Sequence, residues 1–423
     1  MGALASLRLA VAGWQVLCLR LPDDQRPFAD TLRNQGWLQS GIRYFAAAAQ
    51  NTLMAKEARE RIERLAFDMA ESGVELVRFA GGPRVAAGAE GPGLIGATEP
   101  DAQELLKLCG DLWPYPPGLK TLSSDEASRL AGPFHDPALT WLSSPEKVFD
   151  EDALLTEIRQ KAESNGAILR EVSEPVRVNW KPGSSGTTAV AYVGAQMIEP
   201  QRLVLAAGAQ NVTHLASLGE ADGFQIQLTP LLVLEPETPM EARILTMRGT
   251  PRYSVAQHVQ QDRTFLVVGG NFNGGSPSRS VTLPPRRVPA GSCEAIRQAL
   301  PPGLGLRTAR MTAGFELLPP NDWPDFAPYV RGVREGANVV VAHPGRATFA
   351  WKASTTLLEL DGDSSDFGEE DDRGPRPRPL TEGATKSFYG RTLPGTEWNN
   401  SSSIRMHFHP YYEARGMNDE LAD

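Results

Sequence analysis

The sequence has few cysteines, no excess of basic residues and no long apolar run. Its three cysteines lie far apart and form no C-x-x-C pair, which excludes a disulfide framework or a thiolate zinc site and favours the cytoplasm. The 42 basic residues are outnumbered by 51 acidic ones, so nucleic acid is excluded as a general partner. No apolar run approaches the roughly 18 residues of a membrane helix, so no integral membrane segment is expected.

What remains is the composition of a folded protein. Hydrophobic residues make up 41% of the 423 residues and charged residues 22%, values close to those of globular chains. At roughly 150 residues per domain, the length predicts two or three domains, or one large composite. The segment 361–379 is an exception, because its acidic block and alternating Pro and Arg residues cannot bury enough apolar surface to fold.

The first 21 residues predict a helix, a tight turn and a strand. Leu4, Leu7 and Ala10 follow helical spacing, Gly13 suits the left-handed position that ends a helix, and 16–19 is a short apolar strand. This order corresponds to the second and third parts of a βαβ unit whose first strand is absent from the sequence.

Helices and strands alternate along much of the remaining chain, which predicts an α/β fold. Helices are expected at 51–73, 102–108, 150–165 and 348–360, and the rest of 81–120 is expected to be irregular. Strands are expected at 167–169, 176–180, 188–193, 202–206 and 338–342, with 225–234, 242–247 and 264–270 in a second, mixed sheet.

Four separated stretches resemble a family. They are Gly2 through Leu19, the segment Asn34–Tyr44 (NQGWLQSGIRY), the strand and turn at 203–209 (LVLAAGA), and the turn at 344–348 (PGRAT). In order and spacing they resemble the FAD-dependent D-amino-acid-oxidase-like superfamily, and the second resembles the branch of L-2-hydroxyglutarate and glycerol-3-phosphate dehydrogenases. The resemblance covers residues 1 to about 362 and implies FAD as the cofactor.

The resemblance implies a discontinuous architecture in which a Rossmann-like FAD/NAD(P)-binding domain is interleaved with a mixed-sheet substrate domain. The FAD-binding domain would comprise 1–47, 146–220 and 336–362, and the substrate or cap domain 48–145 and 221–335. Residues 363–423 would form a C-terminal tail that is partly disordered.

The resemblance also assigns the cofactor-binding residues, most of them small or acting through the backbone. The start of the first helix would approach the diphosphate, the loop at 35–41 the isoalloxazine, and the turn at 344–348 the pyrimidine ring. Pro175 and Val176 would hold adenine, and the turn at 207–208 would let the diphosphate and ribose pass. The full set is Gly2, Ala3, Gln35, Gly36, Trp37, Leu38, Gln39, Ser40, Gly41, Pro175, Val176, Ala207, Gly208, Pro344, Gly345, Arg346, Ala347 and Thr348.

Residues that act on substrate are expected in the predicted second sheet and near it. His258 is a candidate to deprotonate an alcohol or amine, and a structural histidine is the competing interpretation. Arg43, Arg252 and Arg310 are candidates to hold a carboxylate or phosphate through paired hydrogen bonds. His407 and His409 have the spacing of a strand-borne metal pair but lack a third ligand, so no metal site is predicted.

Three departures from the family pattern weigh on activity. The first strand with its two glycines is missing, Arg20 stands where an acidic residue for the ribose hydroxyls is usual, and Gln39 replaces a histidine. From the family resemblance, the leading hypothesis is still an FAD-dependent oxidase or dehydrogenase that transfers a hydride from a small amine, amino acid or 2-hydroxy acid to the flavin. The alternative is a catalytically silent binding or scaffold relative. A nicotinamide-dependent dehydrogenase fits the opening helix but not the later stretches.

Overall fold

The structure is a computed structural model of the whole chain. It describes residues 1–21, 37–38, 74, 93–112, 119–144, 147–148, 151–183, 186–237, 243–246, 254–260, 263–269, 279–281, 298, 300–301, 304–320, 328–344 and 350–360. The predicted helix at 51–73, Arg43, Arg252, most of the loop at 35–41, the turn residues 345–348 and the tail from 361 lie outside the described residues.

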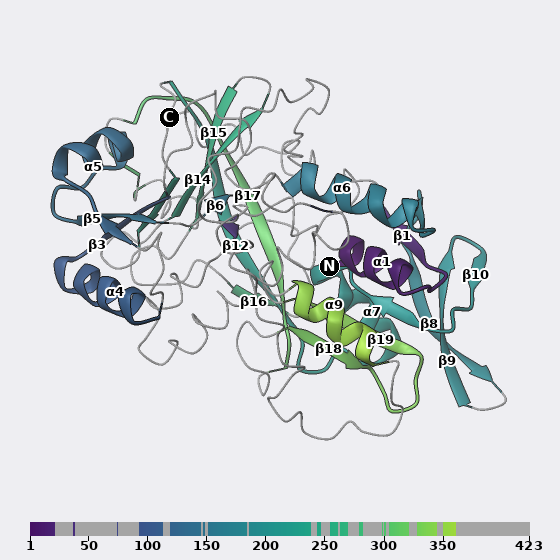
Figure 1. The fold of residues 1–423 in the computed structure, drawn as a ribbon. Helices are drawn as coiled ribbons and strands as arrows, with labels where there is room; N and C mark the ends of the chain where they lie inside the picture. Colours follow the sequence, from purple (N-terminus) through teal and green to yellow (C-terminus); the bar gives the residue numbers. More distant parts are fainter. Residues whose placement is uncertain are drawn as a thin grey trace.

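Helix α1 (Gly2–Val11) is the centre of one half of the molecule. Leu4, Leu7 and Ala10 are buried against helix α6 (Glu151–Ser164), as their spacing predicts. The opposite side of α1 packs through Ala5 on helix α9 (Ala350–Glu359), where the Arg8 guanidinium donates to the Thr355 hydroxyl at 2.5 Å. Figure 1 shows the three helices side by side.

Two sets of strands lie against this helix layer. Strand β1 (Leu17–Arg20) pairs in parallel with β7 (Ile168–Glu171). Strand β11 (Leu203–Leu205) pairs in parallel with β19 (Val339–His343), which pairs antiparallel with β18 (Tyr329–Gly332). Because α1 contacts apolar residues of both sets, we call α1, α6, α9 and these five strands the parallel half.

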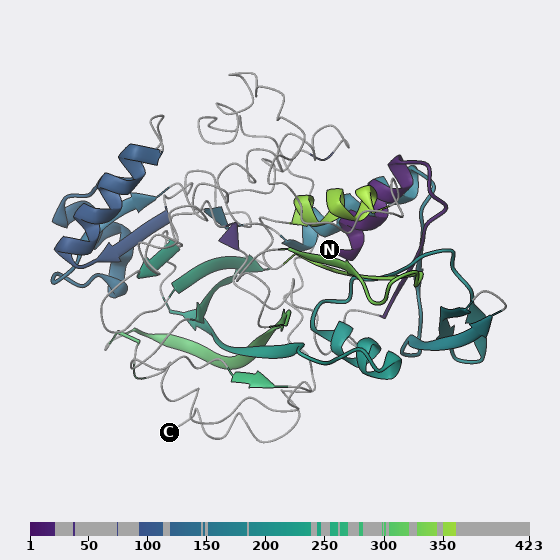
Figure 2. The ribbon, with the colours of Figure 1, turned by 90° about the horizontal axis from the view of Figure 1, so that it is seen from below.

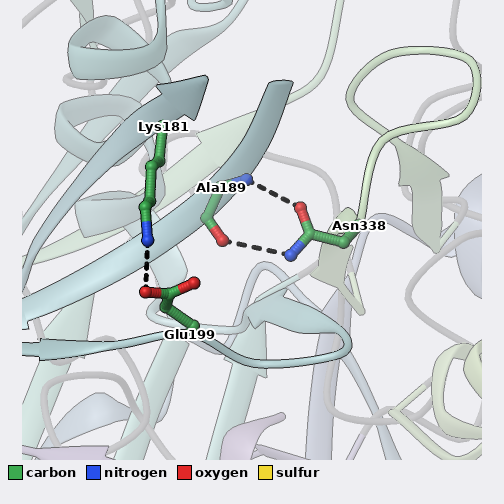
Figure 3. Close-up of polar contacts among 4 residues, drawn as sticks. All are labelled: Lys181, Ala189, Glu199 and Asn338. Atoms are coloured by element: carbon green, nitrogen blue, oxygen red, sulfur yellow. Dashed lines mark hydrogen bonds and ion pairs between the residues drawn. The ribbon is translucent and has the colours of Figure 1, made fainter. Parts of the chain in front are cut away.

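A small antiparallel meander extends from the parallel half. Its strands are β8 (Arg177–Gly183), β9 (Gly186–Val193) and β10 (Gln196–Ile198). The Asn338 side chain attaches it to the start of β19: its Oδ1 accepts the Ala189 N–H at 2.8 Å and its Nδ2 donates to the Ala189 carbonyl at 3.0 Å (Figure 3). The same Nδ2 donates to the Pro200 carbonyl at 3.0 Å. Lys181 and Glu199 form an exposed ion pair in the same meander.

The other half is built on a mixed sheet that has nine strands among the described residues, and we call it the large sheet. Its order along the sheet is β16-β12-β15-β14-β13-β3-β5-β4, with β17 also paired to β12. The strands are β16 (Arg279–Val281), β12 (Gln225–Pro236), β15 (Arg263–Gly269), β14 (Ser254–Gln260), β13 (Arg243–Thr246), β3 (Gly93–Ala97), β5 (Thr140–Ser144), β4 (Lys120–Thr121) and β17 (Leu306–Leu318).

Alternation along these strands gives the large sheet two apolar faces. Leu232 and Leu234 of β12 lie in the main core with residues of helix α5 (Ser124–Ala131), whereas Leu231 and Val233 cluster with Phe265 and Val267 on the other face. Helix α4 (Glu99–Leu112) also packs on this half, and Figures 1 and 2 both place α4 and α5 far from α1, α6 and α9.

The helix expected at 102–108 is present, but the expectation of irregular chain beside it was wrong at 93–97, 99–101 and 109–112. Residues 93–97 form the fully buried strand β3, and α4 begins three residues earlier and ends four residues later than predicted. The glycines of β3 do not break it, because Gly93 and Gly96 pair in register with Ser144 and Trp141 of β5. Among the described residues, no helix combines the length and apolar character needed to cross a membrane.

The remaining described elements are short. They are β2 (Trp37–Leu38) and β6 (Lys147–Val148), which pair with each other, the 3-10 turns η5 (Gly132–Phe134) and η6 (Gly208–Gln210), and helix α7 (Asn211–Leu218).

Candidate cofactor site

The carboxyl ends of β11 and β19 bring two of the predicted stretches to one edge. Leu203 and Leu205 pair with Val339 and Val341, so the two parallel strands end nearly level. The chain continues from β11 into Ala206, Ala207 and Gly208, and from β19 into Pro344. In open α/β sheets, ligands bind outside the carboxyl ends of parallel strands. Ala207, Gly208 and Pro344 therefore lie where such a ligand is bound.

The amino end of α1 lies at the same edge. A Cβ atom added to Gly2 would be 3.5 Å from the Ala206 carbonyl oxygen, so the first turn of α1 is next to the turn that follows β11. The first turn contains no acidic residue, and Met1 provides no side-chain cap. Gly2 and Ala3 thus present uncapped N–H groups and the positive end of the helix dipole, which suit a phosphate.

A buried asparagine fixes the turn after β11. The Asn211 side chain is fully buried; its Oδ1 accepts the Ala207 N–H at 2.9 Å and its Nδ2 donates to the Leu205 carbonyl at 3.0 Å. Gly208 has φ of 59°, a left-handed conformation that favours glycine. Sequence reasoning missed Asn211, although an asparagine at the start of a helix after a glycine turn is a signal for such side-chain to backbone bonding.

Pro175 and Val176 also follow a parallel strand at its carboxyl end. They lie between β7 and β8, four and five residues after Glu171. Pro175 is exposed, and Val176 is partly buried against a cluster that contains Leu205 and Val341. This contact brings the segment to the sheet that carries the Gly208 turn. The described cofactor candidates of the parallel half therefore all follow β7, β11 or β19, or begin α1.

Arg20 and Glu171 close the ends of the other parallel pair. They face each other in register as the last residues of β1 and β7, and the Arg20 Nη2 atom is 3.2 Å from the Glu171 Oε2 atom. The Val172 N–H donates to the Arg20 carbonyl at 2.8 Å, which continues the ladder by one bond.

The described donors and small residues fit a flat, two-phosphate cofactor. Ala206, Ala207 and Gly208 have small side chains or none, so a ligand can approach their backbone closely. The amino end of α1 adds N–H groups that have no partner within the helix. Within the described residues, no three acidic, histidine or cysteine side chains are arranged to hold a metal ion.

The two described substrate candidates, His258 and Arg310, lie on strands of the large sheet. Arg310 of β17 pairs with Val233 of β12, Val233 pairs with Val267 of β15, and Val267 pairs with Ala256 of β14. His258 is two residues beyond Ala256, so positions 258 and 310 belong to the same sheet face. Three strand spacings, about 14 Å, separate their strands. The structure therefore places His258 and Arg310 on one face without making them neighbours.

Parallel strands that end beside a helix amino terminus are the arrangement at which α/β proteins bind dinucleotides. The model of the family "FAD dependent oxidoreductase" matches residues 1–349, and the chain belongs to this family. The protein is an FAD-dependent oxidoreductase of the D-amino-acid-oxidase-like type, and its cofactor is FAD.

Solved structures share this fold at low sequence identity. Iminodiacetate oxidase from Chelativorans sp. BNC1 is 19% identical, with 85% of this chain and 90% of that chain covered and a TM-score of 0.58. Glycine oxidase from Geobacillus kaustophilus is 17% identical, with 88% and 96% covered and a TM-score of 0.58. Glycerol-3-phosphate dehydrogenase from Bacillus halodurans, complexed with FAD, is 12% identical, with 85% and 61% covered and a TM-score of 0.54. No curated protein sequence matches this chain.

Proposed function

We propose that this protein oxidises a small amine or amino acid, with a 2-hydroxy acid as the second substrate class, by hydride transfer to FAD. The observation that carries the proposal is the convergence of Gly2, the turn at 206–208 and Pro344 at one strand edge of a chain from the FAD-dependent family. Iminodiacetate oxidase and glycine oxidase share the fold over most of their length, and their names support an amine substrate.

Different groups of the chain would bind different parts of the cofactor. Gly2 and Ala3 would donate N–H groups to the diphosphate, and Ala207 and Gly208 would let the diphosphate and ribose pass. Pro175 and Val176 would hold adenine through backbone groups. Asn211 keeps the turn at 206–208 in one shape. The loop at 35–41 and the turn residues 345–348 stay predictions for the flavin ring, as does the division into FAD-binding and cap domains.

Bound FAD supplies an acceptor for two electrons, so the protein must orient the substrate and take up a proton. Oxidation removes a hydride from carbon and a proton from nitrogen or oxygen, which leaves an imine or a ketone. His258 would accept that proton, and Arg310, Arg43 and Arg252 would hold a substrate carboxylate. Arg310 and His258 share a sheet face, but about 14 Å separates their strands, so one small substrate would contact only one of the two.

The test is a flavin assay on the purified chain. We expect yellow protein, or colourless protein that takes up added FAD, and anaerobic bleaching of the flavin bands by one member of a substrate panel. The panel contains glycine, iminodiacetate and proline as amines, and 2-hydroxyglutarate and glycerol 3-phosphate as alcohols. Bleaching by an amine supports the first substrate class, and bleaching by 2-hydroxyglutarate alone supports the second. FAD binding without bleaching by any compound contradicts both.

Oxygen consumption distinguishes an oxidase from a dehydrogenase in the same experiment. If the reduced flavin reoxidises in air and releases peroxide, oxygen is the acceptor; if it needs an added dye, the acceptor is another protein or a quinone. We also propose a cytoplasmic location, which the small number of cysteines supports.

A further inference from the structure

One charged pair at the strand ends is unexplained by packing. Arg20 and Glu171 end β1 and β7 in register, and their side chains are 31% and 50% exposed. Exposed ion pairs contribute little to folding, because solvent screens the charges and both side chains lose freedom. A contribution to folding stability therefore does not account for this ion pair.

The lengths of α1 and β1 return Arg20 to the cofactor edge. Helix α1 runs away from Gly2 for ten residues, about 15 Å. After the turn at Gly13, four residues of β1 run back for about 13 Å. Arg20 is therefore nearly level with Gly2, whose neighbour is the turn after β11. Glu171 lies at the same level because β7 is parallel to β1 and in register with it.

The chemistry of this position calls for an acceptor. The ribose of a dinucleotide presents neighbouring hydroxyl groups, and an acidic residue at the end of the strand that follows the first helix usually accepts their hydrogen bonds. In this chain that strand ends in Arg20, which has five donors and no acceptor. The carboxylate of Glu171 is the acceptor beside it, and its two oxygens can take two hydroxyl hydrogens.

We propose that Glu171 of β7 binds the adenosine ribose of FAD and that Arg20 is a positioning residue that holds the Glu171 carboxylate. The acidic residue then lies on the neighbouring strand β7, at the same edge of the sheet. This inference rests on the proposed cofactor site, and it goes beyond that proposal by assigning the ribose contact to Glu171 and its positioning to Arg20.

The test uses cofactors that differ in the adenosine group. Apoprotein of the parent and of Glu171→Ala, Glu171→Gln and Arg20→Ala is titrated with FAD and, separately, with FMN, which lacks adenosine; flavin fluorescence gives each Kd. We expect Glu171→Ala to raise the Kd for FAD at least about tenfold, since hydrogen bonds to a charged group are lost, and to leave the Kd for FMN unchanged. Glu171→Gln keeps one acceptor and should weaken FAD less, and Arg20→Ala should weaken it less than Glu171→Ala.

A matched control is available in the meander. Glu199 pairs with Lys181 and is 51% exposed, close to the 50% of Glu171. Glu199→Ala should leave the Kd for FAD unchanged, and all variants should melt within a few degrees of the parent. If Glu171→Ala lowers the melting temperature sharply, Glu171→Gln provides the binding comparison.

Four outcomes would overturn the assignment. They are an unchanged Kd for FAD in Glu171→Ala, equal weakening of FAD and FMN, an equal effect of Glu199→Ala, and a larger effect of Arg20→Ala than of Glu171→Ala. The last would make the guanidinium itself the contact. Failure of the parent chain to bind either flavin would instead contradict the proposed cofactor site, so the two failures are distinguishable.

Discussion

The two halves of the molecule position their candidate groups in different ways. In the parallel half, strands of three to five residues end at one edge, and the groups at that edge are mostly backbone N–H groups, small residues and turns. In the large sheet, β12 and β17 are 12 and 13 residues long, and the candidates Arg310 of β17 and His258 of β14 lie on one face of the sheet. In the parallel half, the positions of the strand ends determine which groups lie together. In the large sheet, the pairing register between strands determines it.

A pair of leucine truncations should separate the two halves most strongly. Leu7 of α1 and Leu266 of β15 are both fully buried, and each change to Ala should lower the free energy of unfolding by about 2–5 kcal/mol. Only Leu7→Ala should also weaken the binding of FAD, because α1 carries Gly2. Urea unfolding and FAD titration test this, and equal weakening of FAD by Leu266→Ala would contradict the separation.

The amide of Asn338 should have the next largest effect. Asn338→Ala removes three hydrogen bonds between the meander and the start of β19, and we expect a loss of about 2–3 kcal/mol in urea unfolding. Lys181→Ala, which removes an exposed ion pair nearby, should change stability by no more than about 0.5 kcal/mol. Similar losses in both variants would show that the amide clamp adds nothing.

Gly208 and Gly219 test whether the turn at the strand edge is a ligand site. Both have left-handed φ values, 59° and 72°, so Ala at either position should cost about 1–2 kcal/mol of stability. Gly219 ends α7, and a Cβ there would contact nothing within 4 Å. We expect Gly208→Ala to weaken FAD and Gly219→Ala to leave the Kd unchanged. Equal Kd values in the two variants would contradict the cofactor site.

The smallest expected effect concerns His214 of α7. Burial lowers the pKa of His214 below its usual value of 6.5, so the folded chain resists protonation more than the unfolded chain does. Stability from this group is present above about pH 6.5 and falls as the pH drops below it. His214→Gln should therefore lose less stability than the parent between pH 7.5 and pH 5.5 in thermal melts. An identical pH dependence would contradict this.

The sequence predicts the parallel half better than the large sheet. Helix α6 and strands β7, β11 and β19 match their expected positions within a few residues. The helix has apolar residues at helical spacing, and the strands lie at short apolar runs near turn residues. Strand β17 was not predicted, because its Arg, Ala and Gly residues have low strand propensity and its pairing with β12 is set by the tertiary fold. Helix α5 was also missed, although Ser123 and Glu126 form a capping box.

The candidate site shows the same limit. Gly2, Gly208 and Pro344 were predicted because the short stretches that contain them resemble the FAD-dependent family. Asn211 and Glu171 were not, because their roles depend on which segments the fold brings together: Asn211 bonds to the backbone of residues 205 and 207, and Glu171 faces Arg20 across a register of distant strands. A single sequence contains no direct signal for that register.

The long β12–β17 ladder also has a consequence for cooperativity. One end contributes Ile226, Phe315 and Leu317 to the core under α7, and Leu232 and Leu234 of β12 belong to the core under α5. Along β12 these two cores are joined by residues that pair in continuous register with β17, from Ile226 to Leu234. Unfolding of either core removes part of the ladder that supports the other, so we expect the two cores to unfold cooperatively.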